Sequence, residues 1–249
     1  MRDVVYVVIG WSPAIRRYNA TTHQRLADIV INGFSGAYDI AACELTCQLY
    51  VADYRECVWR VSSDGVDIQR WLATSPSDTF SPDTLKPHTL SVTSSRLLVT
   101  SRRDRQLRQF DAAGGDERRR VGLPDYMDPW HAVESPTGTF IVGHDNTQLS
   151  QYQVSEVSTE GQVLRQFSSS SFGVPEHIAV DRQGNIFVAD RNNRSILLLD
   201  AQLTPCRVII DGRQLNKRLP WRLCYMDQSG QLLVGFLGGG VAVFHVLRR

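Results

Sequence analysis

The chain has 249 residues, 42% of them hydrophobic, and a formal net charge of +1. This length suffices for one or two domains with a substantial apolar core. The near-zero net charge gives no overall attraction to nucleic acid or to an anionic membrane surface. No apolar run reaches the roughly 18 residues that a membrane-spanning helix needs, and residues 1–10 lack the separate basic and apolar regions of a signal peptide. We therefore expect a cytoplasmic protein without membrane contacts.

The five cysteines favour reduced thiols over a disulfide framework, because their number is odd. Cys43, Cys47 and Cys57 lie close together in the sequence, and Cys47 and Cys57 flank a predicted hairpin in which they could face each other. Buried free thiols are the favoured interpretation. Zinc at cysteine is disfavoured because no second Cys or His pair stands at ligand spacing.

Six short apolar runs recur along the chain, and each is expected to be the second strand of a repeated unit. They are centred on Tyr6, Tyr50, Leu98, Ile141, Phe187 and Leu233, so the repeat is about 45 residues long. In chain order, the first unit supplies runs at 3–9, 15–18 and 26–31, the second spans about 38–72, the third begins near Pro87, the fourth opens at Asp128, the fifth occupies 172–210 and the sixth opens at Leu219.

The fifth unit shows the internal pattern most clearly. Its apolar runs at 175–181, 186–190, 195–200 and 207–210 are separated by polar turns such as Arg182-Gln183-Gly184-Asn185. Short β-branched and aromatic runs with tight turns between them predict antiparallel strands. Four strands per unit and six units predict an all-β fold, a six-bladed β-propeller with four-stranded antiparallel blades.

The wording of the fifth unit, FGVPEHIAVDRQGNIFVADRNNRSILLLD at 172–200, resembles the NHL repeat family. This family occurs on tripartite-motif proteins and, more distantly, in peptidyl-hydroxyglycine amidating lyase. The segment 40–61 is a fair match, whereas 90–110 has no Asp after its second strand. The resemblance implies a single NHL-type domain over 1–249 that presents a face to protein or to single-stranded RNA.

Both terminal units look incomplete. The first matches only the second, third and fourth strands of a blade, and the last matches only the first three. Either the chain is a fragment of a longer protein, which we favour, or its first blade is irregular.

The start of each first strand should line the mouth of the central channel, so we expect functional side chains there. These positions hold Tyr38, Asp39, His88, Thr89, Trp130, His131, Glu176, His177, Trp221 and Arg222. Such imidazoles, carboxylates and aromatic rings could bind an anion or a metal, or conduct acid–base chemistry. The alternative is that His and Asp at these positions cap strand ends and bond neighbouring blades.

The sequence leaves open whether this mouth binds a metal. The candidate is a zinc or calcium site with His88, His131 and His177 as ligands. The amidating lyase places zinc-binding histidines in P-H-x-[LI] segments, and only Pro87-His88-Thr89-Leu90 reproduces that spacing. His131 and His177 are displaced by one residue, which in a regular strand would turn the side chain away. We therefore expect no cofactor, with metal as the alternative.

A second candidate surface is basic. All of the 27 basic residues except Lys86 and Lys217 are arginines, which suit bidentate contacts to phosphate or carboxylate. The candidates for RNA or anion contact are Tyr54, Arg55, Arg102, Arg103, Arg105, Arg191 and Arg194. The alternative is a solvated surface, because acidic residues are interspersed with the arginine-rich loops.

The favoured function is a binding or scaffold propeller whose partner is a protein or single-stranded RNA. The alternative is a lyase or hydrolase with a metal at the channel mouth, Glu176 as base and Arg222 as anion holder. No G-x-S-x-G, phosphate-binding loop or dinucleotide fingerprint occurs, so we assign no catalytic residue and no nucleotide cofactor, and enzymatic activity stays open.

Overall fold

The computed structural model describes all residues except 1–2, 35, 54–56, 73–85 and 247–249. The described residues form six antiparallel sheets, four with four strands and two with three. This confirms the predicted all-β six-bladed propeller. The chain divides into two compact units, Met1–Arg120 and Val121–Arg249, and each is described by itself.

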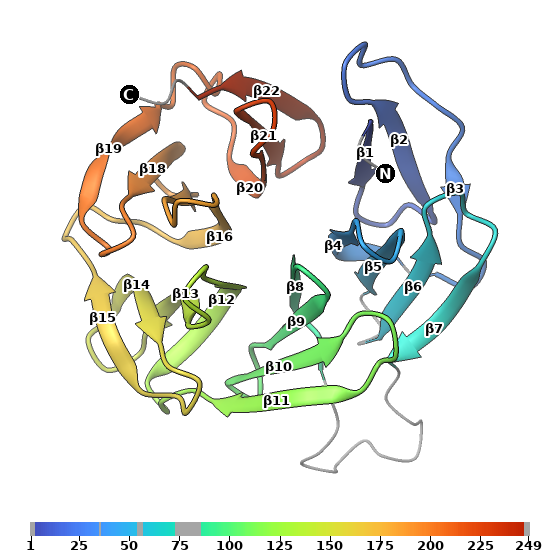
Figure 1. Cartoon of the computed structure of the whole chain (residues 1–249). Coiled ribbons are helices and arrows are strands. Elements are labelled where there is room, and N and C mark those ends of the chain that lie inside the picture. The colour runs from blue at the N-terminus through green and yellow to red at the C-terminus, as the bar shows by residue number, and fades with distance from the viewer. Residues whose placement is uncertain (1–2, 35, 54–56, 73–85, 247–249) are drawn as a thin grey trace. The chain divides into compact units, whose positions relative to one another are not determined.

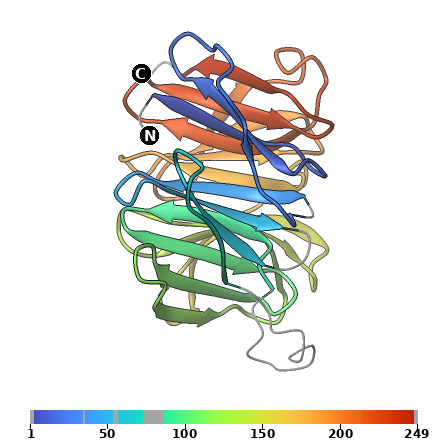
Figure 2. The same cartoon turned by 90° about the vertical axis from the view of Figure 1, so that its right-hand side faces the viewer.

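The first unit contains blades one to three, except for the last two residues of β11 (Figure 1). Blade one is β1 (Val4–Val8), β2 (Ala14–Asn19) and β3 (Ile29–Val30); blade two is β4 (Ala37–Cys43), β5 (Gln48–Asp53), β6 (Val58–Ser62) and β7 (Ile68–Leu72); blade three is β8 (Thr89–Thr93), β9 (Arg96–Ser101), β10 (Gln106–Asp111) and β11 (Glu117–Gly122). Within blades two and three the strands lie side by side in both Figure 1 and Figure 2.

The second unit contains blades four to six. Blade four is β12 (Met127–Glu134), β13 (Phe140–Asn146), β14 (Gln151–Val157) and β15 (Val163–Phe167); blade five is β16 (Pro175–Val180), β17 (Ile186–Asp190), β18 (Ser195–Leu199) and β19 (Pro205–Ile210); blade six is β20 (Pro220–Met226), β21 (Gln231–Phe236) and β22 (Val241–His245). Among the described residues, blades one and six are the three-stranded ones, as the sequence predicted.

The hydrophobic core lies between the faces of neighbouring blades. In β5, Leu49 and Val51 pack toward blade one, whereas Tyr50 and Ala52 pack toward blade three. Successive side chains of a strand point to opposite faces, so a strand covered on both faces needs an unbroken apolar run. This explains why the second strands gave the clearest repeat signal in the sequence.

Carboxylates at strand ends close the turns. The Oδ1 of Asp53 accepts a bond from the Cys57 amide at 3.3 Å, and that of Asp190 accepts one from Asn193 at 3.1 Å. The Oδ1 of Asp200 accepts bonds from the amides of Gln202 and Thr204, both at 2.8 Å. Asx turns of this kind satisfy backbone donors that no neighbouring strand can reach.

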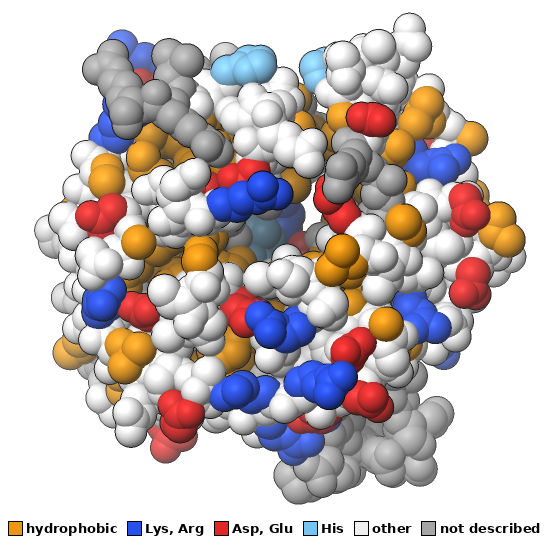
Figure 3. All heavy atoms as spheres, viewed as in Figure 1, with side chains coloured by type: hydrophobic (Ala, Val, Ile, Leu, Met, Phe, Trp, Pro, Cys, Tyr) orange, Lys and Arg blue, Asp and Glu red, His pale blue; other side chains and the backbone are white. Residues whose placement is uncertain are grey.

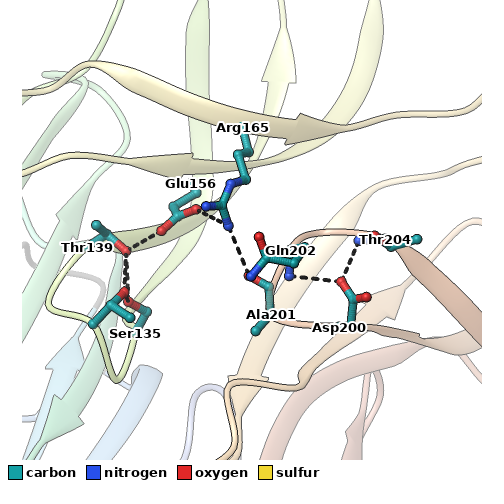
Figure 4. A network of polar contacts seen from close by, with 9 residues as sticks. Ser135, Thr139, Glu156, Arg165, Asp200, Ala201, Gln202 and Thr204 are labelled. Carbon is teal, nitrogen blue, oxygen red and sulfur yellow. Dashed lines mark hydrogen bonds and ion pairs between the residues drawn. The ribbon is translucent and has the colours of Figure 1, made fainter.

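Figure 4 shows how side chains link blades four and five away from their first strands. Arg165 of β15 pairs with Glu156 of β14 at 3.4 Å, and its guanidinium donates to the carbonyl of Ala201 at 3.5 Å. Thr139 donates to the other carboxylate oxygen of Glu156 at 2.7 Å. The network holds the outer strand of one blade against a turn of the next.

All five cysteines are free, as expected, but the expected burial is wrong for Cys47. Cys43 and Cys57 are buried and Cys47 is exposed. Burial, with help from the nearby Asp53, raises the pKa of the Cys57 thiol to about 12, so that this side chain packs as a neutral group. The described part of the chain holds no helix with the length and hydropathy that a membrane span requires.

Gly143 provides a test of the packing between blades four and five. A Cβ at this position would lie 2.9 Å from the carbonyl oxygen of Pro175 and 3.1 Å from Cδ1 of Ile178. Because a backbone atom cannot move aside cheaply, we expect Gly143→Ala to lower the free energy of unfolding by about 1–3 kcal/mol in a urea titration. Gly122→Ala is the matched control, since nothing lies within 4 Å of its added Cβ. Equal stability of the two variants would contradict the expected clash.

Candidate functional site at the first-strand entrances

All of the predicted channel-mouth residues except His88 and Thr89 lie at a β-bulge that recurs in four blades. The pairing between first and second strands shifts between Ala37 and Asp39, Pro129 and His131, Pro175 and His177, and Pro220 and Arg222. Tyr38, Trp130, Glu176 and Trp221 are therefore the extra residues. Three of the four bulges begin with proline, which has no N–H for the ladder and is confined to such places within sheets. Side chains do not alternate regularly between the two faces of a strand at a bulge. The one-residue offset of His131 and His177 from the P-H-x-[LI] spacing therefore does not imply that their side chains turn away from the channel mouth.

In three of the four bulges, the residue after the bulge bonds the next blade within its own unit. In the first unit, Oδ2 of Asp39 accepts a bond from the amide of Leu90 at 2.8 Å. In the second unit, Nδ1 of His131 accepts one from Ile178 at 3.2 Å, and Nδ1 of His177 accepts one from Leu223 at 3.4 Å. All three side chains are buried. These are bonds between neighbouring blades, the role that the alternative interpretation gave to His and Asp at these positions. Because Nδ1 of each imidazole accepts a bond, it carries no proton.

The two imidazoles of the second unit also lie against each other. The ring centroids of His131 and His177 are 3.6 Å apart, with 24° between the ring planes. Burial above all, and then the charges of His131 and Arg222, hold the pKa of His177 well below its usual range. Two stacked imidazoles repel each other when both carry charge, so the stacking opposes protonation of His177 in the same direction as its burial.

In the first unit, two of the entrance residues, Tyr38 and His88, have partly exposed aromatic side chains. The rings of Tyr38 and His88 are in contact, with centroids 4.5 Å apart and planes inclined by 45°. Tyr38 and His88 are partly exposed, whereas Asp39 and Thr89 behind them are buried. The structure therefore brings Tyr38 and His88 together. His131 and His177, the other proposed metal ligands, belong to the second unit.

In the second unit, the entrance residues of blades four, five and six converge on one group. We call Trp130, Glu176, Arg191, Trp221 and Arg222 the Trp–Arg cluster. The carboxylate of Glu176 lies 3.2 Å from Nη1 of Arg191 and 3.7 Å from Nη1 of Arg222. The guanidinium carbon of Arg191 is 5.6 Å from the ring centroid of Trp130 and 5.9 Å from that of Trp221. Arg222 lies 5.2 Å from the Trp221 ring.

Burial and charge within the cluster differ from those of a bare basic patch. The Glu176 side chain is 1% exposed, whereas those of Arg191 and Arg222 are 28% and 18% exposed. The indole N–H of Trp130 donates to Oδ1 of Asp145 at 2.8 Å. The carboxylate of Glu176 therefore faces both guanidinium groups, while Asp145 holds the indole of Trp130. The chemistry of this set is stacking and cation binding more than attraction of anions.

The remaining basic candidates are divided between the two units. Arg102, Arg103 and Arg105 lie at the turn between β9 and β10, and only Arg103 is fully exposed among them. Arg194 is exposed on the turn between β17 and β18. Figure 3 shows basic side chains interspersed with acidic ones on the face in view. Tyr54 and Arg55 lie outside the described residues.

Two of the three arginines of β11, Arg118 and Arg120, are paired with carboxylates of the same blade. Arg118 pairs with Asp111 at 2.9 Å, and Arg120 pairs with Glu117 at 3.0 Å. Arg108 of the adjacent strand β10 contacts Glu117 as well. Sequence reasoning had considered this mixture of charges as the solvated-surface alternative, and these pairs fit that alternative.

Sequence reasoning missed Asp145 and the buried His144, and it did not find the neighbours of Arg191. Asp145, which holds Trp130, had no signal in the repeat pattern. His144 faces Pro129 across the bulge, at the position where Asp190 faces Pro175 in the next blade, and this equivalence could have identified it. Arg191 was proposed only as a surface contact for RNA, but the structure places it between two tryptophans.

The fold and these entrances define an all-β six-bladed propeller with a bulged first-strand motif. No protein-family model and no curated protein sequence matches the chain. Among solved structures, a chain of Kuenenia stuttgartiensis hydrazine synthase is similar, with a TM-score of 0.66 and 10% sequence identity. The match covers 98% of this chain and 92% of that one. At this identity the likeness shows the fold.

Proposed function

We propose that this chain is a protein-binding propeller of the NHL type, with the Trp–Arg cluster as its contact surface in the second unit. The observation that carries this proposal is the pair Trp130 and Trp221, both partly exposed, with Arg191 in contact with both rings. Trp and Arg are the residues that contribute most to the energy of protein–protein interfaces.

The groups behind this surface support binding over catalysis. A general base needs a proton acceptor directed at the substrate. Glu176 faces two guanidinium groups, and Nδ1 of His131 and of His177 accepts a backbone bond. The metal-dependent lyase or hydrolase would need Glu176 as its base. The ion pairs of Glu176 weigh against that assignment.

A protein partner is favoured over single-stranded RNA because of the charge balance. RNA binding needs arginines whose charge is available to phosphates, together with rings on which bases stack. The rings are present, but Arg191 is paired with Glu176, and Arg118 and Arg120 are paired with carboxylates.

Quantitative co-purification with the tagged chain tests the proposal. We expect Trp221→Ala to reduce recovery of bound proteins about 30-fold, the effect of losing a hot spot of about 2 kcal/mol. Trp11→Ala is the control, since this tryptophan is 77% exposed and lies in the first unit. Recovery that survives Trp221→Ala would refute the proposal. Release by ribonuclease, or salt-dependent binding of a fluorescent single-stranded RNA, would favour RNA instead.

A further inference from the structure

The groups around Arg191 have the composition of a receptor for a guanidinium ion. Tryptophan is the ring that attracts cations most strongly, and two tryptophan rings lie within 6 Å of the guanidinium carbon of Arg191. A buried carboxylate, that of Glu176, lies 3.2 Å from one of its nitrogens. Two aromatic faces and a desolvated anion are complementary to a flat cation, and the structure shows the site with such a cation in it.

The receptor is supported by contacts that do not involve Arg191. Trp130 is on β12 and its indole N–H is held by Asp145. Trp221 is on β20, with the guanidinium of Arg222 over its ring. Glu176 is on β16, and Arg222 gives it a second cationic neighbour. Each wall therefore belongs to a different blade and keeps an anchor when the Arg191 side chain is removed.

Arg191 itself lies on a turn and not on a strand. It begins the turn between β17 and β18, where its backbone amide bonds the carbonyl of Val174 at 3.0 Å. Its side chain is 28% exposed. Rotation about side-chain bonds alone can move the guanidinium out, and this restores up to about 2 kcal/mol of rotamer entropy. A competing cation can therefore replace it without a change in the backbone.

We propose that Trp130, Trp221 and Glu176 form a guanidinium-binding site that Arg191 fills in the absence of a partner, and that an arginine side chain of a protein partner binds there by displacing Arg191. The proposal rests on the proposed protein-binding function and names the side chain that is recognised. Arginine fits better than lysine because its planar group stacks on rings and is more weakly hydrated.

The Arg191 side chain competes with any added guanidinium for the same site. If the native side chain occupies the site in about 99% of molecules, an added guanidinium binds about 100-fold more weakly than it would to the open site. Removal of the Arg191 side chain should therefore strengthen binding. If Arg191 contacts an anionic ligand instead, the same substitution should weaken binding.

Methylguanidinium is the probe for this site, and methylurea is its uncharged control of similar shape. We expect Arg191→Ala to show saturable quenching of tryptophan fluorescence at methylguanidinium concentrations at least about 10-fold below those needed for the unmodified chain. Methylurea should give no saturation. The double variant Arg191→Ala with Glu176→Gln should lose the response, because the anion of the site is gone. Absence of saturation in Arg191→Ala, or an equal response to methylurea, would overturn the proposal.

If Arg191→Ala folds poorly, the change of its Tm on addition of methylguanidinium tests the proposal instead. Methylguanidinium should then raise the Tm of Arg191→Ala and not that of the double variant, because a ligand that binds only the folded state stabilises it. A Tm of Arg191→Ala that methylguanidinium leaves unchanged or lowers would count against the site. This outcome can be told apart from failure of the proposed function. If Trp221→Ala loses its protein partners but Arg191→Ala does not bind methylguanidinium, the contact surface stands and the guanidinium site is rejected.

Discussion

Glu176→Ala is expected to lower the free energy of unfolding by about 3 kcal/mol or more, because it removes the buried anion between two arginines. The Glu176 side chain is 1% exposed and faces Arg191 and Arg222. Without it, two guanidinium groups lie close together in a partly buried place with no carboxylate between them. Urea unfolding followed by circular dichroism measures the effect.

Asp28→Ala is the control for this prediction. Asp28 pairs with Arg25 at 2.7 Å, but the Arg25 side chain is 57% exposed. Exposed ion pairs contribute up to about 1 kcal/mol, since water screens the charges. If Glu176→Ala costs no more than Asp28→Ala, then the carboxylate of Glu176 is not the anion that holds the Trp–Arg cluster together.

Acidification is expected to destabilise the second unit through its buried histidines. His144 is fully buried in blade four, where its Nδ1–H donates to the carbonyl of Asp145 and its Nε2 accepts from the hydroxyl of Ser155 at 2.8 Å. Burial lowers its pKa from 6.5 to about 4, against the opposing effects of the Asp145 carbonyl and the charge of Asp128. The pKa of His177 is lowered in the same direction.

The sign of the pH dependence follows from proton binding. Below pH 6.5 the unfolded chain takes up protons at these histidines and the folded chain does not, so stability falls as pH falls. Above pH 6.5 the contribution is complete. His144 alone should account for a loss of about 3 kcal/mol between pH 6.5 and pH 4.

Urea titrations at several pH values measure this slope. His144→Gln should flatten it between pH 6.5 and pH 4, because the group that titrates is gone. His245→Gln, at an exposed position on β22, controls for replacement of an imidazole as such. An unchanged slope in His144→Gln would show that other groups cause the acid sensitivity.

The repeat and the strands could be predicted because they depend on local pattern. In β17, Ile186 and Val188 face blade four and Phe187 and Ala189 face blade six. A strand buried on both faces must be apolar throughout, so the second strands mark the repeat in the sequence. The incomplete blades one and six could be read in the same way, because each strand has its own apolar run.

The site could be predicted only as a set of positions. The sequence marked Trp130, Glu176 and Trp221 by their place in the repeat, and this needed no tertiary structure. The partners were decided by the bulges and by the approach of neighbouring blades. Arg191 is 15 residues after Glu176 and on another strand connection, so nothing local indicates that it fills the space between two tryptophans.

The sequence by itself determined the number of blades, the strands of each blade and the positions that start each first strand. Apolar periodicity and turn residues determine these features through interactions between near neighbours in the chain. Only the tertiary structure decided that His131 and His177 bond adjacent blades and that Glu176 is held between two arginines. Those assignments depend on contacts between residues far apart in the chain, and a residue's type does not reveal whether its polar atoms face the backbone of a neighbouring blade or a ligand.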